Sequence, residues 1–211
     1  MSEKEKLKIT AILLAGGQSK RMGRDKAFLK LGEKTFFRII IEKLNVYTDQ
    51  IIVSANKDKE IYLSQLENTD INSVFVKDKD PYAGPLNAIV SCMPYIKNQL
   101  VFIATCDTPL LEPELIPFFV KKIDGYDAII PVVNGKKQFL NTIYKRAALK
   151  IADKVYEEGK NSLYAWVNRL NVQEVAQEEL KQVDDSLLSY WSINRPEDYE
   201  RLLNIWQKDY Y

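Results

Sequence analysis

Along the first two thirds of the chain, short runs of hydrophobic residues alternate with stretches in which apolar positions recur at helical spacing. The short apolar runs predict buried strands, and the spaced positions predict amphipathic helices. Strands are expected at 8–14, 50–55, 74–77, 100–105 and 128–133, and helices at 36–44, 58–67, 86–93 and 113–123. Strands that alternate with helices of about ten residues predict βαβ units and a mostly parallel sheet.

The pattern is less regular after residue 133. Strands are expected at 139–144 and 190–193, and helices at 146–158, 162–169 and 196–206. The chain has 211 residues, a length that fits one domain, and it shows no internal repeat or low-complexity tract. We therefore predict a single α/β domain, a three-layer sandwich in which helices cover both faces of a mostly parallel central sheet.

Charge and hydropathy argue against several classes of protein. The 30 basic and 29 acidic residues give a net charge of +1, so a nucleic-acid-binding surface is not expected. No apolar run approaches the ~20 residues of a membrane span, and the charged segment 1–6 does not resemble a signal peptide. Cys92 and Cys106 do not form a C-x-x-C pair, and we expect two buried free thiols. These features favour a cytoplasmic protein.

The chain has no histidine. This absence excludes serine–histidine and cysteine–histidine nucleophile pairs, histidine-ligated zinc and a histidine general base. Any chemistry must therefore use carboxylates, lysine, arginine, hydroxyl groups, backbone amides or a metal ion.

The loop after the first expected strand combines glycine with positive charge. Gly16 and Gly17 follow the strand directly, and Arg21, Arg24 and Lys26 come next. A glycine backbone can approach a ligand closely, and consecutive N–H groups in such a turn can bind an anion. The loop therefore predicts a triphosphate site, although a polar surface loop with incidental glycines is the alternative. Neither the P-loop pattern nor the G-x-G-x-x-G pattern occurs in the chain.

Polar residues also follow the other expected strands. In open α/β sheets, ligands bind at the carboxyl ends of the strands. Ser54 and Asn56 end the second strand, Asp78 follows the third, and Asp107 follows the strand at 100–105. Asp107 is a candidate Mg²⁺ ligand, because Mg²⁺ usually takes one or two carboxylates together with phosphate oxygens and water. The alternative for each of these residues is a structural role in the turn after its strand.

The segment 14–26, Leu-Ala-Gly-Gly-x-Ser-x-Arg-Met-Gly-x-Asp-Lys, resembles the signature of the molybdenum cofactor guanylyltransferases, which belong to the nucleotidyltransferase superfamily. The resemblance covers nearly the whole chain. It implies a Rossmann-like nucleotidyltransferase fold, with a nucleotide-binding part at about 8–110 and an acceptor-binding part at about 111–211. It implies that the nucleotide is held by the backbone at Leu14, Ala15, Gly16 and Gly17 and by the side chain of Lys26, with Arg21 facing the phosphates.

The other strand ends match the same family. The resemblance places Ser54 and Asn56 near the guanine base, although many relatives have asparagine at the position of Ser54. It assigns Asp78 to nucleotide binding, where the carboxylate could pair with the N1–H and N2–H₂ donors of guanine. Gly84-Pro85-Leu86 matches the family's entry into the following helix, although a turn before a helix is the alternative. Asp107 stands at the position that the family assigns to the metal.

On the acceptor side, the resemblance points to Gln138, Asn141 and Asn194. On this side the sequence departs from the family pattern at four positions: Phe139 replaces a proline, Asn141 replaces a histidine, Ser192 replaces a common asparagine, and Arg195 replaces a threonine. The segment 194–198 is also typical of a helix start, with a capping residue, a proline and two acidic residues in the first turn.

The resemblance implies a reaction in which GMP moves from Mg²⁺-bound GTP to the terminal phosphate of Mo-molybdopterin and pyrophosphate leaves. Arg21, Lys26 and Asp107 would be the catalytic residues. Molybdoenzyme apoproteins or other proteins of cofactor biosynthesis are further expected partners. One alternative is another nucleotidyltransferase, such as a molybdopterin cytidylyltransferase or a sugar-phosphate nucleotidylyltransferase. The other is a non-catalytic chaperone that binds nucleotide or molybdopterin.

Overall fold

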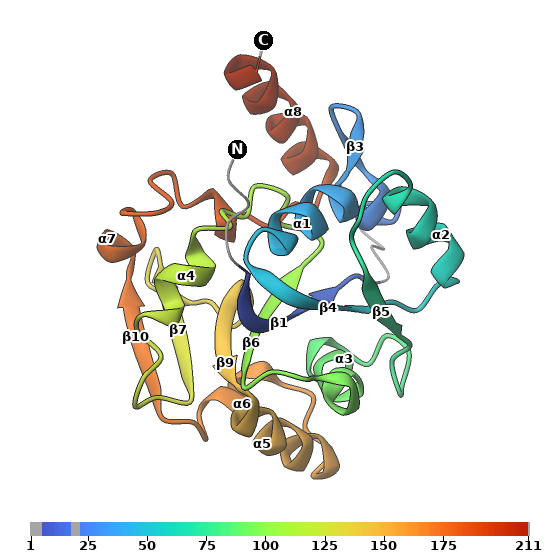
Figure 1. The fold of residues 1–211 in the computed structure, drawn as a ribbon. Helices are drawn as coiled ribbons and strands as arrows, with labels where there is room; N and C mark the ends of the chain where they lie inside the picture. The colour runs from blue at the N-terminus through green and yellow to red at the C-terminus, as the bar shows by residue number, and fades with distance from the viewer. Residues whose placement is uncertain (1–5, 18–21, 211) are drawn as a thin grey trace.

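The structure is a computed structural model that describes residues 6–17 and 22–210, and of residues 208–210 only the backbone. The described chain forms a mixed α/β domain around an eight-stranded sheet (Figure 1). The strands of this sheet are β1 (Leu7–Leu14), β4 (Thr48–Ser54), β5 (Ser73–Val76), β6 (Leu100–Thr105), β7 (Ala128–Val133), β8 (Lys136–Lys137), β9 (Thr142–Lys145) and β10 (Val172–Ala176). A separate two-stranded hairpin contains β2 (Lys30–Leu31) and β3 (Lys34–Thr35).

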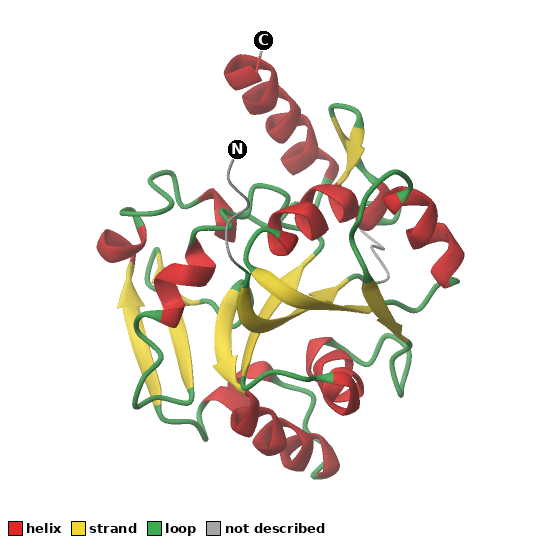
Figure 2. Ribbon diagram, in the orientation of Figure 1, coloured by secondary structure: helices red, strands yellow, loops and turns green. Residues whose placement is uncertain are grey.

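Helices cover both faces of the sheet, as Figure 2 shows. One face carries α1 (Phe36–Asn45), α2 (Lys59–Leu63) and α4 (Leu115–Val120), and the other carries α3 (Pro85–Cys92), α5 (Arg146–Glu157) and α6 (Leu163–Val167). The short α7 (Gln177–Leu180) follows the edge strand β10, and α8 (Pro196–Tyr210) closes the described chain. The predicted three-layer arrangement is confirmed.

The strand order places a switch point at the centre of the sheet. The order is β10-β7-β9-β6-β1-β4-β5, with β8 paired to β7. β1 is parallel to both β4 and β6. From β1 the chain crosses to β4 and β5 on one side and then returns to β6 on the other side of β1. β9 is antiparallel to both of its neighbours, β6 and β7. The carboxyl ends of β1 and β6 meet where the strand order reverses, which is the place where open sheets bind ligands.

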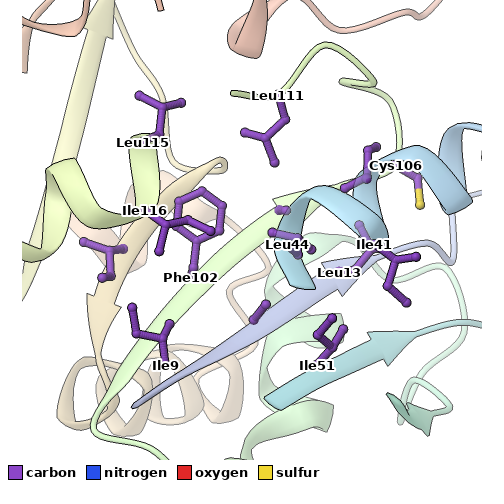
Figure 3. Close-up of a cluster of buried hydrophobic side chains, with 14 of the residues drawn as sticks. Ile9, Leu13, Ile41, Leu44, Ile51, Phe102, Cys106, Leu111, Leu115 and Ile116 are labelled. Atoms are coloured by element: carbon purple, nitrogen blue, oxygen red, sulfur yellow. The ribbon is translucent and has the colours of Figure 1, made fainter. Parts of the chain in front are cut away.

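Alternating side chains of each central strand enter two separate cores. Ile9, Ala11 and Leu13 of β1 belong to the cluster under α1, whereas Ile12 belongs to the cluster over α3. Figure 3 shows Ile41 and Leu44 of α1 packed above Leu13 in the first cluster. Each fully buried aliphatic side chain of this kind contributes about 1.5–3 kcal/mol to the folded state. The sheet is therefore held rigidly between its helices, and its strand ends are fixed in position.

A third, smaller cluster ties the C-terminal segment to the N-terminal hairpin. Leu31 of β2 and Phe36 of α1 are buried together with Ile193 and Leu202 of the C-terminal segment. The Tyr199 hydroxyl also donates to the Lys30 carbonyl over 2.6 Å. α8 therefore packs against residues that follow the glycine loop, far from it in the sequence.

The expected strands at 8–14, 50–55, 74–77, 100–105 and 128–133 are confirmed, as are the main helices between them. The strand expected at 139–144 begins only at Thr142, because Asn141 has a left-handed backbone (φ 55°) that an extended strand cannot contain. The strand expected at 190–193 is wrong. The chain there forms a 3₁₀ turn (Leu188–Tyr190) and an irregular segment whose apolar side chains pack into the third cluster.

The structure also tests the predictions about the two cysteines and about membrane-spanning segments. Cys92 and Cys106 are free and buried, as predicted, and burial raises the pKa of both thiols, which are therefore neutral. Within residues 6–17 and 22–210, no helix is long and apolar enough to cross a bilayer.

Candidate active site

The turn after β1 is packed tightly on one side and open on the other. The Ala15 N–H donates to the Ser54 carbonyl over 2.8 Å, which ties the turn to the end of β4. A Cβ added at Gly16 would lie 2.6 Å from Nδ2 of Asn56 and 3.3 Å from Oδ2 of Asp78, so this position needs glycine. A Cβ added at Gly17 would meet no described atom within 4 Å. The backbone at Gly17 is therefore accessible to a ligand.

Asp78 is held at the end of β5 by residues from the end of β4. The Ser54 hydroxyl donates to Oδ1 of Asp78 over 2.5 Å, and Nδ2 of Asn56 donates to Oδ2 over 2.8 Å. The same Nδ2 atom also donates to the Gly16 carbonyl over 3.0 Å. Since a carboxylate oxygen accepts up to two hydrogen bonds, each Asp78 oxygen retains capacity for another donor.

One atom of this group lacks a partner. Oδ1 of Asn56 is buried and accepts no hydrogen bond from any described residue. The assignment of oxygen and nitrogen in the Asn56 amide follows from these contacts, because both partners of Nδ2 are acceptors. Buried acceptors are rarely left unpaired, and Asn56 is a residue that lines the larger of two cavities beside the turn. The group thus presents acceptors, and it suits a ligand that brings hydrogen-bond donors.

Lys26 and Asp107 meet on the other side of the glycine turn. Nζ of Lys26 lies 3.1 Å from Oδ2 of Asp107 and donates to Oδ1 of Asn194 over 2.6 Å. The Thr105 hydroxyl donates to Oδ1 of Asp107 over 3.1 Å. The two charged side chains are 17% and 21% exposed, so water screens the pair only in part and a ligand can reach it. The Ile193 N–H donates to the Asp107 carbonyl over 2.8 Å and ties the loop after β6 to the C-terminal segment.

The backbone around Lys26 is positioned by its neighbours. Asp25 accepts a hydrogen bond from the Ala27 N–H over 3.0 Å, and its carboxylate pairs with Nζ of Lys57 at 2.8 Å. The Phe28 ring packs at a tilt against Tyr62, with ring centroids 5.1 Å apart, and the Tyr62 hydroxyl donates to the Ala15 carbonyl over 3.3 Å. Burial raises the pKa of Tyr62, so the hydroxyl remains a donor at neutral pH.

Two cavities flank the glycine turn. The larger, about 490 Å³, is lined by Arg24, Asn56 and Tyr62, among others. The smaller, about 290 Å³, is lined by Asp78, Pro85 and Thr105, among others. Gly16, Gly17 and Tyr82 line both cavities. The strand-end residues therefore surround one continuous region on both sides of the turn, with room for a ligand of nucleotide size.

The Gly84-Pro85-Leu86 segment has a mixed placement. Gly84 has a φ of 111°, a value that favours glycine, and Pro85 begins α3 where its missing N–H is least costly. Gly84 and Pro85 line the smaller cavity, whereas Leu86 is fully buried in the core over α3. The segment therefore shapes the cavity through its first two residues.

The three residues expected on the acceptor side do not come together. Asn194 reaches Lys26, as described above. Asn141 is only 2% exposed, and its Nδ2 donates to the Thr108 hydroxyl over 2.9 Å and to the Ser189 carbonyl over 2.6 Å. Gln138 is partly exposed, and its side chain donates to the Lys136 carbonyl over 3.2 Å. The structure brings Asn141 to the loop that follows Asp107, where it connects two segments of the backbone.

Arg21 lies outside the described residues. Leu14 and Ala15 are at the cavity walls, as expected for backbone that contacts a ligand. Sequence reasoning did not identify Thr105, Tyr62 or Tyr82 as site residues. Thr105 lies two residues before Asp107, on the same strand end, and this spacing was the available signal for it.

Comparison with known proteins identifies the family of the chain. The family model described as "MobA-like NTP transferase domain" matches residues 11–175. A protein of Carboxydothermus hydrogenoformans named a probable molybdenum cofactor guanylyltransferase is 30% identical over 200 residues, covering 93% of this chain and 96% of that protein. A molybdenum cofactor guanylyltransferase of Desulfosudis oleivorans is 28% identical over 195 residues, covering 92% and 93% of the two chains.

A solved structure shows the same fold. Molybdopterin-guanine dinucleotide biosynthesis protein A from Archaeoglobus fulgidus superimposes with a TM-score of 0.79 and 23% identity, covering 94% of this chain and 99% of that one. The sheet order and helical layers described above are therefore found in a protein of closely similar architecture.

Proposed function

The chain belongs to the family of MobA-like NTP transferases, and from this premise we propose that it transfers GMP from GTP to the terminal phosphate of Mo-molybdopterin. The products would be the guanine dinucleotide form of the cofactor and pyrophosphate. The observation that carries the proposal is the pairing of Lys26 with Asp107 at 3.1 Å, beside the glycine turn and at the switch point of the sheet.

The group around Asp78 supports guanine as the base. Guanine presents two adjacent donors, N1–H and N2–H₂, and the carboxylate of Asp78 presents two adjacent acceptors. Asn56 contributes by holding the second oxygen of Asp78. Cytosine and adenine present a ring-nitrogen acceptor where guanine has N1–H, and an acceptor facing a carboxylate is repelled. Ser54 acts in this arrangement by holding Asp78.

The phosphates would lie over the glycine turn. Gly16 and Gly17 supply backbone at the wall of the larger cavity, which Arg24 also lines, and Lys26 beside Asp107 would add positive charge. Charge-assisted hydrogen bonds from these groups are roughly twice as strong as neutral ones. Arg21 belongs to the same proposal through its place in the motif.

The residues present fit Mg²⁺. Asp107 is a partly exposed carboxylate, a hard oxygen ligand of the kind that Mg²⁺ prefers. Within residues 6–17 and 22–210, no cluster of three or more acidic, histidine or cysteine side chains could hold a metal ion. A site with one protein carboxylate suits an ion that takes its other ligands from substrate phosphates and water. Bound there, the ion would neutralise charge on the phosphates.

The reaction requires no protein base. A phosphomonoester has a second pKa of about 6, so the acceptor phosphate is already largely dianionic at neutral pH. One of its oxygens forms a bond to the α-phosphorus of GTP while the bond from that phosphorus to the bridging oxygen breaks. The electron pair leaves with pyrophosphate, and no proton needs to move. The work of the chain is to align the two phosphates and to stabilise charge through Lys26, which agrees with the absence of histidine.

Asn194 supports a role on the acceptor side, because it holds the ammonium group that the transferred phosphates would approach. Gln138 and Asn141 remain acceptor-side predictions from the family motif. The non-catalytic chaperone is the weaker candidate, since binding alone does not require a lysine paired with a metal-type carboxylate at the phosphate site.

The test is a thermal-shift panel with Mg²⁺ and equal concentrations of GTP, ATP, CTP and UTP. A tenfold preference for one nucleotide at saturation adds about 1.4 kcal/mol of stabilisation. We expect a GTP-selective shift that is lost in Asp78→Asn, which replaces an acceptor by a donor. Asp58→Asn, an exposed change ahead of α2, is the matched control and should shift as the wild type does.

A preference for CTP or UTP would assign the chain to a different nucleotidyl transfer. A GTP shift without formation of dinucleotide from GTP and Mo-molybdopterin would favour the chaperone. Chromatographic detection of the dinucleotide and pyrophosphate in a single-turnover reaction would complete the proposal.

A further inference from the structure

The loop between β5 and α3 contains a turn of unusual composition. The Ala83 N–H donates to the Asp80 carbonyl over 3.1 Å, and Pro81 and Tyr82 are the central residues. Tyr82 has a φ of 67°. Proline followed by a residue with positive φ is the type II pattern, in which glycine or asparagine normally takes the third position. A side chain other than these costs roughly 1–2 kcal/mol in the left-handed region.

Packing does not account for tyrosine at this position. The side chain is 48% exposed, and its hydroxyl donates to no other described residue. Other left-handed positions differ: Asn68, Asn134 and Asn141 are asparagines, which tolerate this conformation, and Leu187 packs against the core. Tyr82 therefore keeps a strained backbone while leaving its aromatic ring largely in solvent.

The turn is anchored on the N-terminal side of this residue. The Lys79 N–H donates to the Ser91 hydroxyl over 2.8 Å, and Nδ2 of Asn87 donates to the Asp80 carbonyl over 2.7 Å. The Tyr156 hydroxyl donates to the Asp80 carboxylate. These contacts tie the turn to α3 and α5. The ring is thus presented by a fixed turn and needs little ordering when it contacts a ligand.

Tyr82 lies where its ring can contact a ligand in either cavity. Tyr82 lines both cavities, together with Gly16 and Gly17, and the space over Gly17 is open. Asp78 and Asn56, which present acceptors, line one cavity each. Because Tyr82 lines both cavities, a flat ligand whose edge bonds to Asp78 lies within reach of the Tyr82 ring.

We propose that the ring of Tyr82 stacks on the base of the bound nucleotide and thereby favours a purine over a pyrimidine. The inference rests on the proposed nucleotidyl transfer and extends it. Hydrogen bonds to the edge of a base do not by themselves distinguish the two rings of a purine from the single ring of a pyrimidine, whereas stacking does. Stacking on an aromatic side chain strengthens binding of a base about tenfold or more, and the effect grows with the overlapping ring area. Tyr82 would then be a specificity-determining residue.

The experiment compares three variants by calorimetric titration with Mg²⁺·GTP and Mg²⁺·CTP and by thermal unfolding without nucleotide. Tyr82→Gly removes the ring and relaxes the turn, whereas Tyr82→Phe keeps the ring and the strain. Asn68→Gly relaxes another exposed left-handed position (φ 62°) outside both cavities, and it is the matched control.

We expect Tyr82→Gly to unfold at an equal or higher temperature than the wild type and to bind GTP about tenfold more weakly, with a smaller loss for CTP. Tyr82→Phe and Asn68→Gly should bind GTP within about twofold of the wild type. Stability and affinity would then change in opposite directions, which a purely structural tyrosine cannot produce.

GTP binding unchanged in Tyr82→Gly would overturn the proposal. An equal loss for GTP, CTP and inorganic pyrophosphate would also overturn it, because the ring would then act on the phosphates. The wild-type preference between GTP and CTP tests the proposed function separately. If the wild type prefers CTP, the proposed reaction fails, and the ratio of variant to wild-type affinity for CTP still decides whether the ring stacks.

Discussion

In the half of the sheet formed by β1, β4, β5 and β6, Asn56 and Asp78 line cavities beside the glycine turn, whereas in the half formed by β7, β9 and β10 Asn141 hydrogen-bonds to the protein itself. Asn56 and Asn141 illustrate the difference. In each, Nδ2 donates to two acceptors and Oδ1 is buried without a described partner. Asn56 lines the larger cavity, but Asn141 lines neither cavity beside the glycine turn.

The direction of the strands explains the contrast. The first half is parallel throughout, so its carboxyl ends converge and its polar residues share one region. β9 runs the other way, and Asn141 precedes it at the same edge of the sheet as the end of β6. A polar residue that begins a strand at this edge lies among the neighbouring loops and forms hydrogen bonds with their residues. A polar residue that matches a family motif can therefore serve a ligand in one half and the fold in the other.

The largest effect is expected from the charged pair. Asp107→Asn and Lys26→Ala should each reduce guanylyl transfer by about 100- to 1,000-fold, as is typical when one group that stabilises transition-state charge is lost. Both residues are partly exposed, so the unfolding temperature should change little. Single-turnover kinetics and thermal unfolding measure the two quantities.

Lys34→Ala, which breaks an exposed pair with Glu42 on the hairpin and α1, is the control for loss of a lysine ion pair. Transfer should remain at the wild-type rate in this variant. If Lys26→Ala also retained the wild-type rate, the pair would belong to the fold and the first half of the comparison would fail.

The next effect tests the second half of the sheet. Asn141→Ala removes two hydrogen bonds and places alanine in a left-handed backbone, and it should lower the free energy of unfolding by about 2 kcal/mol. GTP affinity should stay within about twofold of the wild type. Denaturant unfolding and GTP titration provide the measurements.

Asn134→Ala is the matched control, because Asn134 is an exposed left-handed residue (φ 49°) and reports the backbone contribution alone. Unchanged stability in Asn141→Ala, with a raised KM for Mo-molybdopterin, would instead make Asn141 an acceptor-binding residue and remove the contrast.

A smaller effect is expected from alanine substitutions at the two adjacent glycines, which should differ from each other. Gly16→Ala would push its Cβ against Asn56, and the resulting shift of Asn56 and Asp78 should weaken GTP binding about tenfold. The new Cβ of Gly17→Ala would meet no atom of residues 6–17 and 22–210 within 4 Å, and this variant should leave the unfolding temperature unchanged. Equal unfolding temperatures for the two variants would show that the turn can shift to accommodate a side chain at Gly16.

The smallest effect concerns the surface of the second half. Hydrogen bonds from Arg169 and Lys160 lower the pKa of Glu158 to about 2. A carboxyl with a lowered folded pKa stabilises the fold above its unfolded pKa of about 4.5, and this contribution is lost as the pH falls towards 2. Glu158→Gln should slightly flatten the decline of the unfolding temperature between these pH values, and 0.5 M salt should reduce the difference from the wild type.

Much of the first half could be predicted because its signals are local. Each strand is a short apolar run, and Gly16, Asp78 and Asp107 follow such runs directly. The contact of Asn194 with Lys26 joins residues that are 168 positions apart, and only tertiary packing through the third cluster brings them together. β10 was missed because an edge strand with two exposed residues among its five gives a weak apolar signal.

Tyr82 shows a different limit. The sequence Asp80-Pro81-Tyr82-Ala83 is compatible with a turn in which Tyr82 has negative φ, and nothing in the composition selects the left-handed form. That choice depends on Asn87 and Ser91 of α3, which fix the backbone on the N-terminal side of the turn. Strain of this kind is visible only in the folded chain.

The contact of the C-terminal segment with the glycine-turn side has a consequence for biosynthesis. A ribosome releases the strands that carry Gly16, Asp78 and Asp107 before it has made Ile193 and Asn194. The nascent chain can therefore form the first half of the sheet while the Asp107 loop still lacks its hydrogen bond from Ile193 and Lys26 still lacks Asn194. The order of translation thus delays assembly of the complete site, and an interrupted chain that ends before Ile193 would be released without it.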